Sequence, residues 1–145
     1  GRLIRTGKGL FKSPVAATFD IALPAFHGLI GEDGNFQGLC ETAGIPYAGM
    51  RTMASSVLMD KAVTKHLLKA LDIPTLPFVK LKRDPAEGYT LPLKEIESLM
   101  KSVGYPAILK PVHMGSSIGI AKVKNDEEVR QCLPAIFKND YAVKY

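Results

Sequence analysis

Three segments of the sequence carry residue types that could bind an anion or assist a reaction. The first is the glycine-rich segment 27–34, which begins with His27 and follows a short apolar run. Glycines let the backbone approach a ligand closely, and the helix predicted to follow presents an N-terminus that favours an anion such as a carboxylate. His27 could donate a hydrogen bond to that anion. An ordinary turn with a packed histidine is the alternative, and the residue types alone leave both open.

The other two segments centre on Lys61 and Lys110. Lys61 lies on a predicted helix, where a lysine is usually a solvated charge. Lys110 closes a predicted strand and precedes a loop that contains Gly115, Ser116 and Ser117. Such a loop can fold over phosphates, because its N–H groups and hydroxyls donate to oxygens while the lysine supplies positive charge. The residue order of a Walker A loop is absent, and an ordinary flexible hairpin is the alternative.

Metal sites and disulfides are not expected. His113 has no Cys, Asp or second His nearby at metal-ligand spacing. Cys40 and Cys132 are far apart and belong to no CxxC pattern. The sequence shows neither a secretory signal nor an apolar stretch long enough to span a membrane. We therefore expect a cytoplasmic protein that does not associate with membranes.

The elements that position these segments alternate between strands and helices. Strands are predicted at 19–23, 78–81, 107–110, 119–123 and 141–145, and helices at 35–43, 52–71, 96–103 and 125–136. Gly44 should end the first helix, and Asp60 should divide the second into two by capping. Pro134 should kink or end the last helix. Strands and helices in this order predict an α/β fold.

The net charge of +5 on 145 residues raises the question of nucleic-acid binding. Residues 1–49 hold four bases and four acids, so residues 50–145 carry the whole excess. The chain has no Trp and no arginine-rich run with interleaved aromatic residues. A solvated basic surface is therefore favoured over a nucleic-acid interface.

Taken in order, these segments resemble the D-alanine–D-alanine ligase family of the ATP-grasp superfamily. The motifs that carry the resemblance are HGxxGEDG at 27–34, QG at 37–38, E at 41, GIPY at 44–47, SSxxMDK at 55–61, KP at 110–111 and GSSIG at 115–119. The resemblance covers residues 19–145. It implies two parts: residues 1–52 as the end of a Rossmann-like N-terminal substrate domain, and residues 53–145 as the small ATP-grasp lobe, cut before the adenine hinge.

The resemblance also implies an activity and residue roles. The family joins two D-alanines into the dipeptide of peptidoglycan synthesis through an acyl phosphate, and it hydrolyses ATP. His27 matches the histidine beside the first amino-acid site, and Lys61 and Lys110 match lysines that hold nucleotide phosphates. Gly115, Ser116 and Ser117 match the loop over those phosphates, where Ser116 also ties the loop to the substrate site. ATP and D-alanine are then the expected small-molecule partners, with Mg²⁺ bound by residues outside this chain and a homodimer as the assembly.

Two other functions stay open at this point. One is a ligase of the same branch that makes D-alanine–D-lactate or D-alanine–D-serine, because the residues that select the second substrate lie mainly beyond this chain. The other is a binding module that keeps the lobe without the chemistry. In either case, we expect the isolated chain neither to ligate D-alanine nor to bind ATP tightly.

Overall fold

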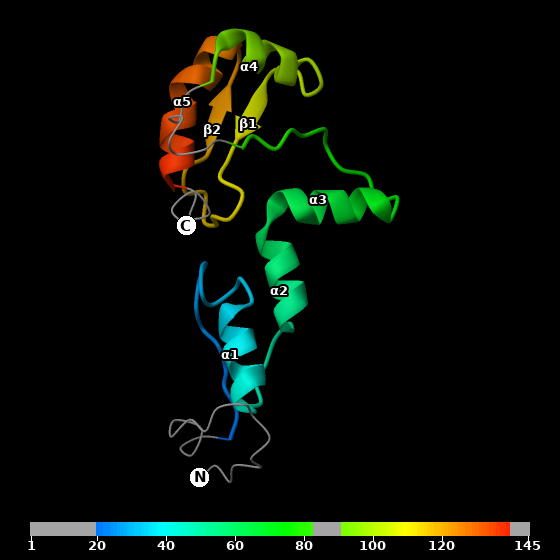
Figure 1. Ribbon diagram of the computed structural model, residues 1–145, viewed down its shortest axis with the longest axis vertical. Coiled ribbons are helices and arrows are strands. Elements are labelled where there is room, and N and C mark those ends of the chain that lie inside the picture. The colour runs from blue at the N-terminus through cyan, green and yellow to red at the C-terminus, as the bar shows by residue number, and fades with distance from the viewer. Residues whose placement is uncertain (1–19, 83–90, 140–145) are drawn as a thin grey trace. The chain divides into compact units, whose positions relative to one another are not determined.

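The computed structural model describes residues 20–82 and 91–139, and its chain divides into two compact units (Figure 1). Unit 1 is Gly1–Asp60 and unit 2 is Lys61–Tyr145. Helices combine with a small antiparallel sheet, so the predicted α/β class is confirmed. The predicted domain boundary after residue 52 stays a prediction, and the division between the units lies after Asp60. Within the described ranges, no helix is long and apolar enough to cross a membrane.

Unit 1 contains helices α1 (Asn35–Ala43) and α2 (Thr52–Met59). The first helix ends as predicted, because Gly44 adopts a left-handed conformation with φ 68°. The backbone N–H of Ile45 then donates to the carbonyl of Cys40 at 2.9 Å, which satisfies one of the last carbonyls of the helix. The position of Gly44 is thus explained by its freedom at positive φ.

Gly34 precedes α1 and lies against α2. Its φ is 96°, and a Cβ built on it would overlap the Ser56 hydroxyl and come within 2.7 Å of the Thr52 carbonyl. The Ser56 hydroxyl donates to the Asp33 carbonyl at 2.8 Å and to the Thr52 carbonyl at 3.0 Å. The turn before α1 is therefore fastened to α2 through a contact that only glycine permits.

The predicted strand 19–23 is wrong over the residues that the structure describes. Only Ala22 takes part, in a single parallel bridge to Tyr47. The Ala22 N–H donates to the Pro46 carbonyl at 2.8 Å, and the Ala48 N–H donates to the Ala22 carbonyl at 3.0 Å. The apolar run has one short partner segment and no second neighbour, so most of its side chains stay exposed instead of lining a buried sheet.

Unit 2 contains α3 (Lys61–Ala70), α4 (Leu93–Met100), β1 (Ala107–Leu109), β2 (Ala121–Val123) and α5 (Asp126–Asn139). The two strands form an antiparallel hairpin in which Ala107 pairs with Val123. Helices α4 and α5 pack together, and α5 lies against both strands (Figure 1). These elements enclose an apolar core made of Leu91, Ile96, Met100, Ala107, Val123, Val129, Leu133 and Phe137.

Helix boundaries follow the predictions in most places. The stretch 52–71 is divided at Asp60, as expected. Asn125 caps α5, because its side-chain oxygen accepts from the Glu128 N–H at 2.9 Å, and the Glu128 carboxylate accepts from the Lys124 N–H at 2.9 Å. An early end at Pro134 is wrong, because the helix continues through it to Asn139.

Two further predictions differ from the structure or lie outside it. Residues 78–81 form no strand, and the Phe78 ring instead meets the His66 ring of α3, with centroids 5.0 Å apart. Within α1, Leu39 is 65% exposed although Phe36, Leu39 and Cys40 recur at the spacing of one helix face. The predicted strand 141–145 lies outside the described residues.

Candidate functional site

The loop between β1 and β2 contains a tight turn with two serines at its centre. The Ile118 N–H donates to the Gly115 carbonyl at 3.1 Å. Ser116 and Ser117 have φ values of 51° and 60°, a left-handed conformation at both central positions that glycine or asparagine usually occupies. Such backbone strain costs about 1–3 kcal/mol per residue and is concentrated at functional sites. Both serines are exposed, so their hydroxyls can reach a ligand.

Lys61 is brought to this loop, as its predicted role requires. It is the first residue of α3, and its ammonium donates to the carbonyl of Val112 at 3.1 Å and to the carbonyl of Met114. Its backbone N–H also donates to the Val112 carbonyl, at 3.3 Å. Lys61 therefore fastens the start of the loop to the start of α3.

Lys110 occupies the position directly after β1, at the entrance to the same loop. It is exposed, and among the described residues no carboxylate or carbonyl pairs with its ammonium. The pKa of Lys65 of α3 lies below its usual value. Burial of Lys65 is the larger cause, and repulsion by the charge of Lys110 is the second. Lys61, Lys110, Gly115, Ser116 and Ser117 thus all belong to unit 2 and to one loop with its anchoring helix.

Lys65 was not predicted as a site residue. Its signal in the sequence is the spacing of Lys61, Lys65 and Lys69, which places the three on one helical stripe. A stripe of lysines is usually a solvated face, so spacing alone could not single out Lys65. Its contacts are what separate it from an ordinary surface lysine, because it is only partly exposed and its ammonium donates to the Leu76 carbonyl at 3.0 Å.

His27 lies in unit 1, at the start of the glycine-rich loop. Its side chain is exposed, and the described residues offer it no hydrogen-bond partner. The loop behind it is closed by its own carboxylates: the Gly28 N–H donates to Glu32, and the Ile30 N–H donates to Asp33 at 2.8 Å. His27 is therefore presented to solvent from a loop whose shape is fixed internally.

The expected anion at the N-terminus of α1 is supplied by the chain itself. The Asp33 carboxylate accepts from the Asn35 N–H at 3.0 Å and from the Asn35 side-chain amide at 2.9 Å. Burial opposes ionisation of Asp33, but the hydrogen bonds from Ile30 and Asn35 together outweigh it and hold the pKa of Asp33 below its usual value. An ordinary turn, the alternative considered for residues 27–34, thus explains most of this segment. The His27 imidazole remains exposed on it.

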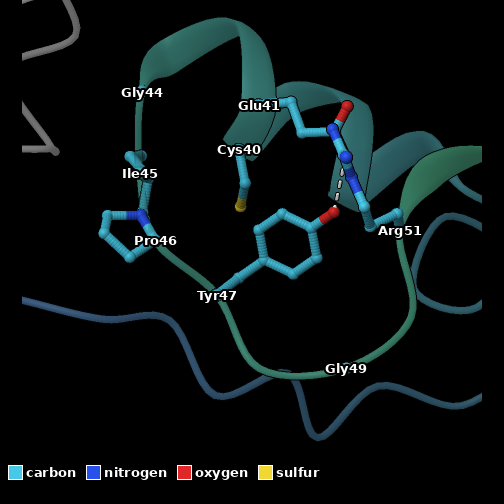
Figure 2. A pocket seen from close by; sticks show the side chains of 8 residues that line it. All are labelled: Cys40, Glu41, Gly44, Ile45, Pro46, Tyr47, Gly49 and Arg51. Carbon is cyan, nitrogen blue, oxygen red and sulfur yellow. Dashed lines mark hydrogen bonds and ion pairs between the residues drawn. The ribbon is translucent and has the colours of Figure 1, made fainter.

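A shallow pocket of about 380 Å³ lies at the other end of α1 (Figure 2). Tyr47 donates to the Glu41 carboxylate at 2.7 Å, and the Arg51 guanidinium lies 3.4 Å from the same oxygen. The hydrogen bond from Tyr47 to Glu41 lowers the pKa of the Glu41 carboxyl, and the same hydrogen bond raises the pKa of the Tyr47 hydroxyl. Burial raises the pKa of the Cys40 thiol, which also lines the pocket. Tyr47 and Arg51 both bind the Glu41 carboxylate, and the raised pKa keeps the Cys40 sulfur a thiol. These residues therefore close the turn after α1 rather than offering a base or a nucleophile.

In the described ranges, no group of three or more His, Cys, Asp or Glu side chains is placed to hold a metal ion. The lysines and the serine turn are instead suited to an oxyanion such as phosphate, because they offer donors and positive charge.

Two family models match this chain. The model described as D-ala D-ala ligase N-terminus matches residues 4–50, and the one described as D-ala D-ala ligase C-terminus matches residues 67–144. The D-alanine–D-alanine ligase of Enterococcus faecalis is 41% identical over 135 residues, which are 93% of this chain and 38% of that protein. D-alanine–D-alanine ligase A of Chromobacterium violaceum is 39% identical over 88% of this chain and 33% of its own length.

Solved structures agree with the sequence relatives. The D-alanine–D-alanine ligase of Helicobacter pylori matches with a TM-score of 0.74 and 32% identity, over 95% of this chain and 41% of that one. The VanG D-Ala:D-Ser ligase of Enterococcus faecalis matches with a TM-score of 0.69 and 36% identity, over 83% of this chain and 34% of that one. The chain thus spans about two fifths or less of the length of these proteins.

Proposed function

Because the chain belongs to the D-alanine–D-alanine ligase family, we propose that it is part of an ATP-dependent ligase that joins two D-alanines. The proposed reaction transfers the γ-phosphoryl group of ATP to the carboxylate of the first D-alanine, with ADP as the leaving group. The amine of the second D-alanine then attacks the acyl phosphate and displaces inorganic phosphate. The dipeptide product would serve peptidoglycan synthesis in the cytoplasm, where ATP is available.

The observation that carries this proposal is that two lysines, Lys110 at the start of one loop of unit 2 and Lys61 on the helix that contacts it, lie with the strained serine turn of that loop. Phosphoryl transfer requires neutralised charge and correct positioning more than covalent help from the protein. Lys110 offers an ammonium that no described residue pairs with at the entrance to the loop, and the serines offer hydroxyl and N–H donors at its tip. We assign these residues, with Gly115, to the phosphates of the nucleotide.

Lys61 takes two tasks in this proposal. Its ammonium is bonded to the loop carbonyls of Val112 and Met114, so it first holds the loop beside α3. When a nucleotide is bound, the same ammonium lies at the phosphates and shares its protons with their oxygens. The proposed role of Ser116 is to link this loop to the amino-acid site.

His27 is assigned to the first D-alanine. It is exposed on a loop whose carboxylates are already engaged with backbone N–H groups, so the imidazole is the polar group left to meet a substrate. The proposed enzyme is a homodimer that uses Mg²⁺. Mg²⁺ would reduce the negative charge of the phosphates, and its ligands would come from residues outside this chain.

A full-length ligase containing this sequence tests the proposal through Lys110→Ala. We expect D-alanine-dependent ADP release to fall by at least about a hundredfold, because a phosphate contact made in the transition state is lost. The matched control is Lys122→Ala, which removes an exposed lysine from β2 of the same hairpin. Near-normal turnover of Lys110→Ala would refute the assignment.

A D-alanine–D-serine ligase is the second candidate, favoured by the match to VanG at 36% identity. Product analysis with D-alanine, D-serine and D-lactate as competing acceptors separates the activities. A product formed mainly with D-alanine supports the first proposal. A module without chemistry would release no ADP with any acceptor.

A further inference from the structure

The start of α3 lies against the segment that begins at Lys110, through the contacts of Lys61. Lys65 follows Lys61 by one helical turn, so the two side chains share a face. The Lys61 ammonium contacts the carbonyls of Val112 and Met114, which follow Lys110 by two and four residues. This geometry brings Lys65 towards the same loop entrance as Lys110.

Lys65 is held in a defined position, unlike a typical surface lysine. Its ammonium donates to the Leu76 carbonyl at 3.0 Å and lies 5.1 Å from the centroid of the Phe78 ring. The Phe78 ring is itself fixed by an edge contact with His66, the next residue of α3. A lysine ordered in advance loses less conformational entropy when it meets a ligand.

Lys65 and Lys110 place two positive charges close enough for the charge of Lys110 to act on Lys65. Among the described residues, no carboxylate pairs with either ammonium. Burial, and after it the charge of Lys110, lowers the pKa of Lys65, so the two groups repel in the free protein. A bound anion converts this repulsion into attraction to a shared partner.

We propose that Lys65 is a third cation of the phosphate site, where it adds its charge to those of Lys61 and Lys110 when a nucleoside di- or triphosphate binds. The inference rests on the proposed function, because it assumes that the loop holds phosphates. It assigns the residue to binding and gives it no part in bond formation. The Leu76 carbonyl and the Phe78 ring serve to aim its ammonium.

The test compares two lysine substitutions on the same helix in a full-length ligase containing this sequence. Lys65→Met keeps an unbranched side chain of similar length and removes the charge. We expect it to weaken ADP binding by about three- to tenfold. Lys69→Met removes an exposed lysine one turn further along and should change ADP affinity by less than about twofold. Lys65→Arg should bind ADP nearly as the unmodified enzyme does.

Adenosine is the second probe, because it lacks phosphates. Isothermal titration calorimetry should give the same adenosine affinity for Lys65→Met as for the unmodified enzyme. Equal losses of ADP and adenosine affinity would show a structural role and overturn the inference. Lys65→Gln, checked by thermal unfolding, replaces Lys65→Met if the latter fails to fold.

Lys110→Met separates failure of this inference from failure of the proposed function. If Lys110→Met weakens ADP binding while Lys65→Met and Lys65→Gln do not, the phosphate site stands and the inference is wrong. If none of these substitutions affects ADP binding, the loop does not hold phosphates and both proposals fail.

Discussion

Different interactions stabilise the interior of unit 1 and the interior of unit 2. Unit 2 has a contiguous apolar core in which Ile96, Val123, Val129 and Leu133 are each no more than 1% exposed. In the described part of unit 1, the buried side chains include two polar ones, Gln37 and Ser55, and only small apolar ones. The hairpin of unit 2 is therefore supported by hydrophobic burial, whereas the His27 loop of unit 1 depends on hydrogen bonds made by its carboxylates.

The polar character of unit 1 is clearest around α1. The Gln37 side-chain amide donates to the Gly31 carbonyl at 2.9 Å, beneath the glycine-rich loop. Several large apolar side chains remain exposed, among them Leu23 at 73% and Met53 at 79%. Mutations in unit 2 should therefore change stability mainly through lost apolar burial, and mutations in unit 1 mainly through lost hydrogen bonds and close backbone contacts.

The largest effect should come from the core of unit 2. Ile96→Ala removes a side chain that is 1% exposed, and we expect a loss of about 2–5 kcal/mol in the free energy of unfolding. Leu93→Ala on the same helix, at a residue 43% exposed, should cost much less. Chemical denaturation followed by circular dichroism measures both. Equal losses would mean that α4 does not support the hairpin through this core.

The next effect isolates the close approach in unit 1. Gly34→Ala should destabilise unit 1 by about 2–4 kcal/mol, because the new Cβ meets Ser56 and the Thr52 carbonyl at a positive φ. Gly28→Ala is the matched control, since Gly28 also has a positive φ, 76°, but a Cβ there meets nothing within 4 Å. Site-resolved hydrogen exchange reports the stability of α1. If both variants lose the same stability, backbone strain explains the effect and the contact with α2 does not.

A smaller effect tests the carboxylate that fixes the His27 loop. Asp33 has a lowered pKa in the folded chain, so its contribution is fully present above the unfolded pKa, about 4, and disappears as the pH falls through and below that value. Asp33→Asn should remove about 0.5–1 kcal/mol at pH 7 and flatten the acid limb of the stability profile. Asp20→Asn, at an exposed carboxylate outside this loop, is the control and should change the stability at pH 7 much less. Parallel profiles for the unmodified chain and Asp33→Asn would contradict the role of Asp33.

The smallest effect concerns the pocket after α1. Tyr47→Phe removes the hydrogen bond to Glu41 at the protein surface, and we expect only a small loss of stability. The pKa of Glu41 should rise towards its ordinary value, because the hydrogen bond that lowers it is gone. Carbon-detected NMR titration of the glutamate carboxyl groups measures the change. An unchanged Glu41 pKa would show that the remaining contacts, from the Thr52 backbone and Arg51, set it.

The sequence predicted the elements whose ends are set by local chemistry. Gly44 and Asp60 were placed correctly because a left-handed cap and a break between helices depend on neighbouring residues. The strands 19–23 and 78–81 were not predicted correctly, because pairing depends on a partner far away in the chain. Pro134 interrupts only one hydrogen bond of α5, and packing of Val129, Leu133 and Phe137 in the core holds the helix beyond it.

The candidate site was predictable from its order of motifs, and its internal contacts were not. Only the family resemblance placed Lys61 beside the serine loop; the residue types alone did not. The contacts of the Lys61 ammonium with two loop carbonyls, and the left-handed conformations of Ser116 and Ser117, depend on the folded backbone. The position of Lys65 was not predictable either, because it depends on a carbonyl and a ring 11 and 13 residues further along the chain, those of Leu76 and Phe78.

The most direct test of the central claim is amide hydrogen exchange in a full-length ligase containing this sequence, measured with and without ADP. We expect ADP to slow exchange in residues 110–120, which hold Lys110 and the serine turn, and to leave exchange in residues 27–34 unchanged. Unchanged exchange in residues 110–120 at saturating ADP would contradict the claim that this loop of unit 2 holds the phosphates.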